Sequence, residues 1–358
     1  MADVYRVACI GASRMGSWFD DTMRARAAKE GGRWLEWVPG SVAAVCQAVE
    51  QTELVAVCDL DQALVEQMQA RWHIPAGYAD YQEMIERERP DIVAIVTSWG
   101  STHAEIAAAV AETGLVRGII CEKPIGASMA QADRVVEACR RNGVVFSCSH
   151  VGRWNPRYRL AQRWIAEGAI GEVRAITCSA MGNLLHFGTH HTDAMAGLAG
   201  DADPEWAFGV VEPPPALPET DWRVADPVGG GYIKLKNGVH LLMEGVSPFP
   251  RSYQVAGTAG KICLWNDMQQ VQLWGKGGLA GGGLVPGPLQ SPPATRSYAW
   301  RQMAELIDVL EHGGKTSCNE VDAARALEMA LALRLSHDRG GVRVPFPIDD
   351  RTLTVDSR

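Results

Sequence analysis

The sequence lacks the features that mark membrane, secreted and nucleic-acid-binding proteins. No hydrophobic run approaches the ~18 apolar residues of a transmembrane helix, and the first residues lack the basic segment and cleavage site of a secretory signal. Lys and Arg form no cluster that could follow a phosphate backbone, and the net charge is −8. We therefore expect no membrane and no nucleic-acid partner.

Paired cysteines are also missing. The chain has nine cysteines, an odd number, and no C-x-x-C pair. Several stand inside apolar runs, where a free cysteine behaves as a small buried hydrophobic residue. The pattern argues against a disulfide framework and against a cysteine zinc site, and we expect a reduced, cytoplasmic protein without a metal ion.

The composition is that of an ordinary globular protein, and the length suggests two domains. The chain has 358 residues, of which 47% are hydrophobic and 21% are charged. In the first 150 residues, short apolar runs alternate with segments of helical periodicity, which is typical of a parallel sheet covered on both faces. The expected strands are 5–10, 54–58, 92–96, 119–121 and 144–147, and the expected helices are 62–72, 81–87, 102–113 and 129–142.

The rhythm changes after about residue 150. A helix is expected at 158–167, followed by longer, alternating strands at 172–178, 231–235, 239–246 and 254–256. Asn237-Gly238 is a strong hairpin signal between two of these strands. The Gly/Pro-rich segment 275–294 is expected to be a mobile surface loop, and helices are expected at 298–312 and 320–338.

We therefore predict an α/β chain in two domains. Residues 1–148 form an N-terminal Rossmann domain with a doubly wound parallel sheet. Residues 149–358 form an α+β domain with a mostly antiparallel sheet.

A glycine-rich turn follows the first expected strand. Gly11-Ala12-Ser13-Arg14-Met15-Gly16 resembles G-x-G-x-x-G with Ser13 at the middle glycine. Gly11 would make the tight turn, Ser13 is small enough for the backbone to approach a pyrophosphate, and Gly16 would allow close packing of helix on strand. The helix N-terminus would then offer free N–H groups to the phosphates, so we expect dinucleotide binding by residues 11 and 13–16.

An acidic residue ends the second expected strand. Asp59 would accept hydrogen bonds from the adenosine ribose and repel a 2′-phosphate, which predicts NAD as the cofactor, with NADP as the alternative. The usual spacing is about 20 residues, but Asp59 follows Gly16 by 43. An insertion over about residues 18–40, which carries Asp20, Asp21, Trp34 and Trp37, explains the excess.

Further motifs resemble the glucose–fructose oxidoreductase / inositol dehydrogenase (Gfo/Idh/MocA) family. Glu122-Lys123-Pro124 follows a buried strand, as the E-K-P motif does in that family. Three more segments match the family's order: Thr97-Ser98 with His103, the stretch Arg153–Tyr158, and Gly188–Asp193. The likeness covers nearly the whole chain.

The resemblance implies a Rossmann domain joined to an open-faced sheet domain, with NAD(P) and a sugar, cyclitol or related polyol as reactants. It implies a homodimer or homotetramer formed through the second-domain sheet. Beyond the glycine turn and Asp59, it assigns cofactor contacts to Thr97, Ser98, His103, Glu122 and Lys123. It assigns substrate contacts to Lys123, Arg153, Asn155 and Asp193.

The resemblance makes Lys123 and His190 the catalytic pair, and the chemistry agrees. Alcohol oxidation develops negative charge on oxygen, which a protonated Lys123 would stabilise. A neutral His190 would take the proton. His186 stands four residues earlier, where many polyol dehydrogenases of the family have Asp, so the proton relay through His186 stays open. Asp193 could orient His190 if the segment is helical.

Three other functions remain open. The first is a redox-neutral NAD-dependent glycosidase or isomerase that uses transient oxidation. The second is a metal enzyme with His186, His190 and Asp193 on one helical face. The third is a non-catalytic NAD-binding sensor.

Overall fold

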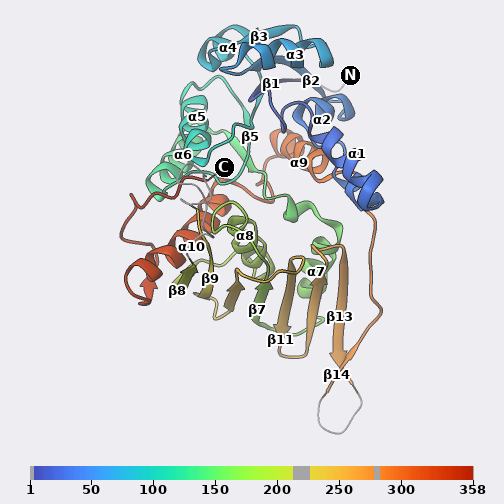
Figure 1. Cartoon of the computed structure of the whole chain (residues 1–358), viewed down its shortest axis with the longest axis vertical. Helices are drawn as coiled ribbons and strands as arrows, with labels where there is room; N and C mark the ends of the chain where they lie inside the picture. Colours follow the sequence, from blue (N-terminus) through green and yellow to red (C-terminus); the bar gives the residue numbers. More distant parts are fainter. Residues whose placement is uncertain (1–3, 213–225, 278–282, 358) are drawn as a thin grey trace. The chain divides into compact units, whose positions relative to one another are not determined.

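The computed structural model describes residues 4–212, 226–277 and 283–357, and the chain divides into two compact units (Figure 1). The first unit comprises Met1–Gly126, Gln131–Val151 and Ala294–Val321. The second comprises Ala127–Ala130, Gly152–Pro293 and Asp322–Arg358.

The first unit is built on a parallel six-stranded sheet in the order β3-β2-β1-β4-β5-β6. The strand order reverses between β1 and β4, which is where doubly wound folds bind their ligands. On one face, β1 shares a hydrophobic core with α2, α3 and α9. The predicted Rossmann sheet is confirmed.

The elements of this unit alternate as predicted, with three additional helices between the first two strands and one additional strand at Ala76–Tyr78. The strands are β1 (Tyr5–Ile10), β2 (Thr52–Cys58), β3 (Ala76–Tyr78), β4 (Ile92–Ile95), β5 (Gly118–Cys121) and β6 (Val145–Cys148). The helices are α1 (Phe19–Glu30), the 3-10 helix η1 (Gly32–Trp37), α2 (Val42–Ala48), α3 (Gln62–Trp72), α4 (Tyr81–Glu88), α5 (Gly100–Glu112), α6 (Met129–Asn142) and α9 (Tyr298–His312).

The helix α9 lies in the first unit, whereas the sequence assigned residues 149–358 to a single second domain. Its apolar side chains Met303, Leu306 and Ile307 belong to the core beneath the parallel sheet. Its Gln302 donates to the Ser147 hydroxyl, 3.1 Å away, at β6. Long-range packing of α9 on this sheet therefore interrupts the second domain, which sequence order alone does not reveal.

The second unit is built on a nine-stranded, mostly antiparallel sheet in the order β14-β13-β12-β11-β7-β10-β9-β8-β15, with β7 and β10 parallel (Figure 1). Its strands are β7 (Val173–Ser179), β8 (Pro204–Glu212), β9 (Val228–Leu235), β10 (His240–Glu244), β11 (Ser252–Gly257), β12 (Gly260–Trp265), β13 (Gln270–Lys276), β14 (Leu284–Pro286) and β15 (Val344–Pro345). Its helices are α7 (Pro156–Ala166), α8 (Gly188–Leu198) and α10 (Glu320–Asp338), preceded by the 3-10 helix η2 (Val151–Trp154).

Two turns of this sheet test the sequence predictions. The hairpin at Asn237-Gly238 is confirmed, since β9 and β10 pair antiparallel across it and Gly238 has a φ of 90°. The segment 275–294 is not entirely loop, because Leu284–Pro286 pairs with β13. Residues 278–282 of that predicted loop lie outside the described residues.

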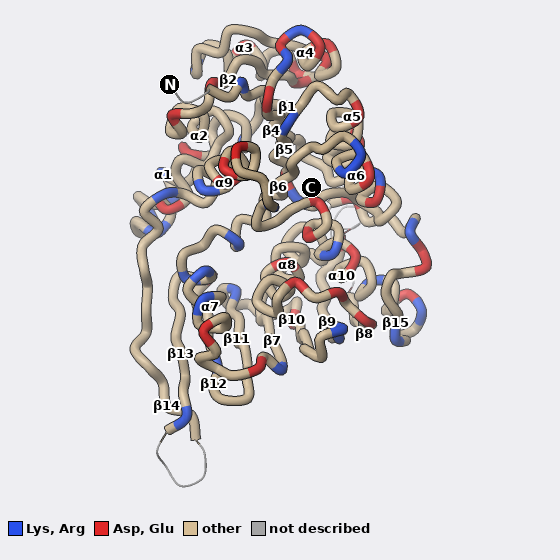
Figure 2. The backbone as a smooth tube through the Cα atoms, turned by 180° about the vertical axis from the view of Figure 1, so that it is seen from behind, with Lys and Arg blue, Asp and Glu red and all other residues tan. Residues whose placement is uncertain are grey.

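The surface charges, the helix lengths and the cysteines relate to the classes of protein that the sequence argues against. Figure 2 shows acidic and basic positions intermixed along α4 and α6, and ion pairs such as Arg87–Glu83 and Arg140–Glu137 link neighbouring turns of these helices. In the described part of the chain, no helix is both long and apolar enough to span a membrane. All nine cysteines are free and buried, including the several that the sequence places inside apolar runs. Burial raises the pKa of Cys46 to about 12, so this thiol stays protonated.

Candidate active site

The turn after β1 forms a backbone cradle that side chains would fill. Gly11 has a φ of 109°, and a Cβ added to it would lie 2.7 Å from the Val96 carbonyl oxygen. A Cβ on Gly16 would lie 2.1 Å from the carbonyl oxygen of Gly11. Both positions thus require glycine, as the motif predicts. This narrow turn at the carboxyl edge of the sheet fits the pyrophosphate of a dinucleotide.

The helix that follows this turn is split by the insertion. Residues 13–18 form a first helical turn, with N–H groups of Ser17 and Trp18 bonded to the carbonyls of Ser13 and Arg14. The helix resumes at α2, where the N–H groups of Val42 and Ala43 bond to the carbonyls of Met15 and Gly16. In an uninterrupted helix, those two carbonyls would accept from residues 19 and 20.

Residues 19–41 therefore form the insertion, close to the predicted 18–40. Removing these 23 residues from the 43 between Gly16 and Asp59 leaves 20, which is the usual spacing of this nucleotide-binding pattern. The structure thus explains why the acidic residue comes so late in the sequence.

Buried polar contacts close the insertion at its base. The carboxylate of Asp20 accepts from the N–H groups of Gly40 and Ser41 and from the Ser41 hydroxyl, at 2.6–3.0 Å. Trp37 packs edge-on against Tyr298 of α9, with ring centroids 4.8 Å apart. Glu36 accepts from the Tyr298 hydroxyl at 3.2 Å. The insertion is thus anchored to its own ends and to the start of α9.

Asp59 lies at the end of β2, beside the glycine turn. One carboxylate oxygen accepts from the Ala12 N–H at 2.8 Å, and the other accepts from the Asp61 N–H at 3.0 Å. Each oxygen has a second acceptor position. Asp59 can therefore hold the turn and still accept from ribose hydroxyls.

Arg14 and Met15 occupy the first helical turn after the glycine. The Arg14 guanidinium lies 4.8 Å from the centroid of the Phe19 ring, at the start of the insertion. Burial lowers the pKa of Arg14, while the negative charge of Glu122 opposes that shift. The turn and the E-K-P loop thus interact electrostatically.

The loop after β4 is held by a buried histidine. The ring nitrogens of His103 each lie 2.9 Å from a backbone carbonyl oxygen, one of Pro124 and one of Thr97. His103 is only 1% exposed and ties these two loops together, and its contact with the cofactor stays a prediction. The Thr97 hydroxyl contacts that of Thr102, which donates to the Trp99 carbonyl. Ser98 is exposed on the same loop.

Lys123 follows β5 in the loop that His103 holds. Glu122 and Lys123 are half-buried, and Pro124 is buried. A Cβ on Gly100, the first residue of α5, would lie 2.8 Å from Pro124 Cγ, so the helix packs tightly on this loop. Because β1, β2, β4 and β5 are parallel, their carboxyl ends bring the glycine turn, Asp59, Thr97 and Lys123 to one edge of the sheet.

His190 lies in the first turn of α8, in the second unit. Its N–H bonds to the Phe187 carbonyl, and its side chain is half-buried, as is that of His186. His186 precedes α8, which begins at Gly188. The regular helical face that would carry His186, His190 and Asp193 to one metal ion is therefore not formed.

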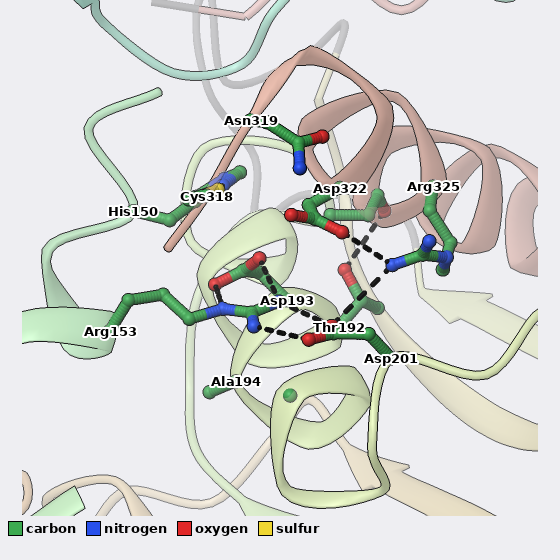
Figure 3. Close-up of polar contacts among 12 residues, drawn as sticks. His150, Arg153, Thr192, Asp193, Ala194, Asp201, Cys318, Asn319, Asp322 and Arg325 are labelled. Atoms are coloured by element: carbon green, nitrogen blue, oxygen red, sulfur yellow. Dashed lines mark hydrogen bonds and ion pairs between the residues drawn. The ribbon is translucent and has the colours of Figure 1, made fainter. Parts of the chain in front are cut away.

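Asp193 belongs to a buried ionic network (Figure 3). Arg153 donates from Nε and NH2 to both oxygens of Asp193 at 2.8–2.9 Å, and from NH1 and NH2 to Asp201. Arg325 bridges Asp201 and Asp322. Burial acts to lower the pKa of Arg153, but Asp193 and then Asp201 outweigh it and hold that pKa well above its usual value.

Asn155 is likewise engaged within the protein. Its side-chain oxygen accepts from the N–H groups of Arg157 and Tyr158 and caps α7, and its amide donates to the Met268 carbonyl. Substrate binding by Arg153, Asn155 and Asp193 stays a prediction, and the structure gives each a buried protein partner.

The sequence missed several residues around α8. His191 follows His190 on α8 and is buried, and its Nδ1 is 3.5 Å from the Tyr253 hydroxyl. Burial, aided by the positive charge of Arg251, lowers the pKa of His191 well below its usual value, so it stays neutral. Asp201 and Arg325 were missed too, because an isolated Asp or Arg carries no local signal of burial.

Residues 5–150 match the family model described as "Oxidoreductase family, NAD-binding Rossmann fold". A D-apiose dehydrogenase of Paraburkholderia graminis is 31% identical over 34% of this chain and 32% of its own length. A 2,7-anhydro-N-acetylneuraminate hydratase of Mediterraneibacter gnavus is 30% identical over 35% and 32%. The chain thus matches about a third of the length of these relatives.

Solved structures extend the likeness to the whole fold. A levoglucosan dehydrogenase in complex with NADH and L-sorbose superposes with a TM-score of 0.77 at 20% identity, over 97% of this chain and 100% of that one. The two-domain architecture predicted from the sequence is therefore that of known oxidoreductases. Residues 5–150 thus match the NAD-binding Rossmann domain of the oxidoreductase family that the motifs resemble.

Proposed function

We propose that this protein is an NAD-dependent oxidoreductase that acts on a hydroxyl-bearing carbon of a sugar, cyclitol or related polyol. The observation that carries the proposal is the edge of the parallel sheet, where the glycine cradle, Asp59 at its restored spacing and the Lys123 loop come together. The dehydrogenases among the matched proteins support the same class of substrate.

Each residue has a distinct role in this proposal. The glycine turn and the first helical turn bind the pyrophosphate, and Asp59 binds the adenosine ribose and disfavours a 2′-phosphate. The bound nicotinamide supplies the hydride acceptor. Lys123 stabilises the negative charge that develops on the substrate oxygen, and His190 takes the hydroxyl proton.

The experiment is a substrate panel. The purified protein is incubated with NAD or NADP and with aldoses, anhydrosugars and cyclitols, and formation of reduced cofactor is followed by its near-ultraviolet absorbance. The proposal expects reduction of NAD with one class of polyol, and slower reduction of NADP. Cofactor binding without turnover of any polyol would instead indicate a sensor.

A redox-neutral reaction is the second candidate, because one matched relative is named a hydratase. In such a reaction, the substrate would be oxidised transiently and reduced again at the end of each cycle. Product analysis by mass spectrometry separates the two candidates. Conversion of substrate without accumulation of NADH, on cofactor retained through purification, favours the redox-neutral reaction.

We also propose that the protein works in the cytoplasm as a homodimer or homotetramer. Phe208 and Leu242 lie on one face of the second sheet, each opposite Tyr232, and are 40% and 39% exposed. Val210, on the same face of β8, is 53% exposed. A second copy would cover this apolar surface. The molar mass measured by light scattering at micromolar protein concentration tests the proposed assembly. The mass of a monomer would refute it.

A further inference from the structure

The segment before α8 is held by backbone contacts to residues some 40 positions away. The N–H of Leu184 donates to the Pro227 carbonyl at 2.7 Å. The N–H groups of Leu185 and His186 each donate to one carboxylate oxygen of Asp226, at 2.8 Å. The backbone that leads into the first turn of α8, and so to His190, is fixed by these three bonds.

Asp226 is a buried carboxylate whose oxygens face hydrogen-bond donors. It is 0% exposed, and its Oδ2 also accepts from the Ser357 hydroxyl at 2.6 Å. Ser357 is 0% exposed as well, although it is close to the C-terminus. A buried carboxylate is tolerated only when such donors compensate for lost hydration. The bonds that Asp226 accepts from Leu185, His186 and Ser357 therefore depend on one another.

The tail that carries Ser357 is itself fixed within the second unit. The N–H of Val355 donates to the Ala127 carbonyl at 2.9 Å, and Val355 is buried. The Ser357 hydroxyl is therefore held close to Asp226 by its own backbone. Hydrogen bonds thus link the tail, Asp226 and the segment 184–186 to one another.

We propose that Asp226 and Ser357 are positioning residues that form a latch on the backbone of Leu185 and His186, and thereby hold His186 and His190 in their working orientation. The latch places a fixed carboxylate at the backbone of position 186, whose own side chain is an imidazole. The catalytic consequence rests on the proposed function, whereas the latch can be tested without any activity.

The test compares Asp226→Asn and Ser357→Ala with the wild-type protein by amide hydrogen exchange. An Asn offers one acceptor oxygen where two N–H groups need one each, so at least one of the amides of Leu185 and His186 loses its acceptor and its protection. We expect exchange in peptides covering 183–190 to rise at least about tenfold in Asp226→Asn and by a smaller factor in Ser357→Ala. The glycine turn at 11–16 should be unchanged.

Thr354→Ala is the matched control, because the Thr354 hydroxyl donates only to the nearby Thr352 carbonyl at the exposed part of the tail. It should leave exchange at 183–190 as in the wild type. If Asp226→Asn does not fold, Ser357→Ala decides the question by itself.

Kinetics then separate positioning from general destabilisation. With a polyol that is turned over, both latch variants should lower kcat and leave the KM for NAD within about twofold, since the cofactor residues lie in the first unit. Unchanged exchange at 183–190, or a rise spread evenly over the second unit, would overturn the latch. If the wild-type protein turns over no polyol, the proposed function fails, and the exchange pattern still decides the latch.

Discussion

The segments that carry Lys123 and His190 are held in different ways. Lys123 follows the buried strand β5, and its loop is fixed by His103 of α5, the helix before that strand, through the Pro124 carbonyl. His190 follows an irregular segment that is fixed by Asp226 and Ser357. The first arrangement follows from a repeating fold pattern, and the second depends on side chains that meet only after folding.

This difference indicates which of the two segments can be altered without affecting nucleotide binding. The Lys123 loop and the Thr97 loop share one support, His103, so under the proposed function a mutation there affects cofactor binding and chemistry together. The His190 segment rests on polar contacts within the second unit, and these can vary while the nucleotide-binding pattern stays intact. His186, which stands where many polyol dehydrogenases of the resembled family have Asp, falls in this second segment.

The largest expected effect compares a buried ion pair of the second unit with an exposed one of the first. Arg153→Ala leaves the buried Asp193 without its bidentate partner and should lower the free energy of unfolding by about 3–5 kcal/mol. Arg71→Ala removes a bidentate pair with Asp21 whose side chains are 41% and 55% exposed, and should cost less than about 1 kcal/mol. Denaturant unfolding of both variants measures the two losses. Similar losses of unfolding free energy in the two variants would contradict the expected difference between a buried and an exposed ion pair.

Lys123→Ala tests the segment of the first unit. Loss of the ammonium group removes stabilisation of the developing oxyanion, and turnover should fall at least about 100-fold with the fold intact. Circular dichroism and steady-state kinetics give the two readouts. Lys315→Ala, at an exposed position of the same unit, is the matched control. Turnover close to wild type would remove Lys123 from the chemistry.

Asp59→Ser tests the nucleotide side of the same unit. Without the carboxylate, repulsion of a 2′-phosphate disappears, and kcat/KM for NADP relative to NAD should rise about tenfold or more. Asp61→Ser is the control, because Asp61 caps α3 by accepting from the Ala63 N–H and serine can do the same. An unaltered cofactor ratio in Asp59→Ser would show that the assignment of Asp59 is wrong.

The smallest effect concerns the buried His191, which follows His190 on α8. Its pKa is lowered by burial, so below its unfolded value of about 6.5 the unfolded chain binds a proton that the folded chain does not. Stability should therefore decrease as the pH falls below that value, by at most about 1.4 kcal/mol per pH unit from this group. His191→Gln should flatten the dependence of Tm on pH between about 7 and 5.

His73→Asn serves as the control for that measurement. His73 is exposed and has a left-handed backbone, which asparagine tolerates. An unchanged pH profile in His191→Gln would show that His191 does not resist protonation in the folded protein.

The fold could be predicted from the sequence where periodicity or turn chemistry is local. The helices at 62–72, 129–142, 298–312 and 320–338 and the strand at 5–10 have the bounds that the pattern predicts. The helix α1 was missed because only Phe19, Asp20 and Met23 of its residues are buried, so it has no apolar stripe. The strand β14 was missed because its residues are exposed and do not alternate.

The candidate site likewise contains residues that the sequence pattern reveals and residues that it does not. The glycine turn and Asp59 could be found because backbone geometry at a phosphate cradle demands particular residues, and the structure even accounts for the displaced Asp59 through the split helix. The roles of His103 and Asp226 could not be found. Each acts on backbone groups of a distant loop, and no spacing in the sequence reports such a contact.

One measurement tests the central claim directly. The protein is purified, denatured, and assayed for released NAD(H) or NADP(H), while the intact protein is titrated with both cofactors. We predict that the protein binds NAD(H), either retained through purification or bound on titration, and that it binds NADP(H) more weakly. Binding of neither cofactor would contradict it.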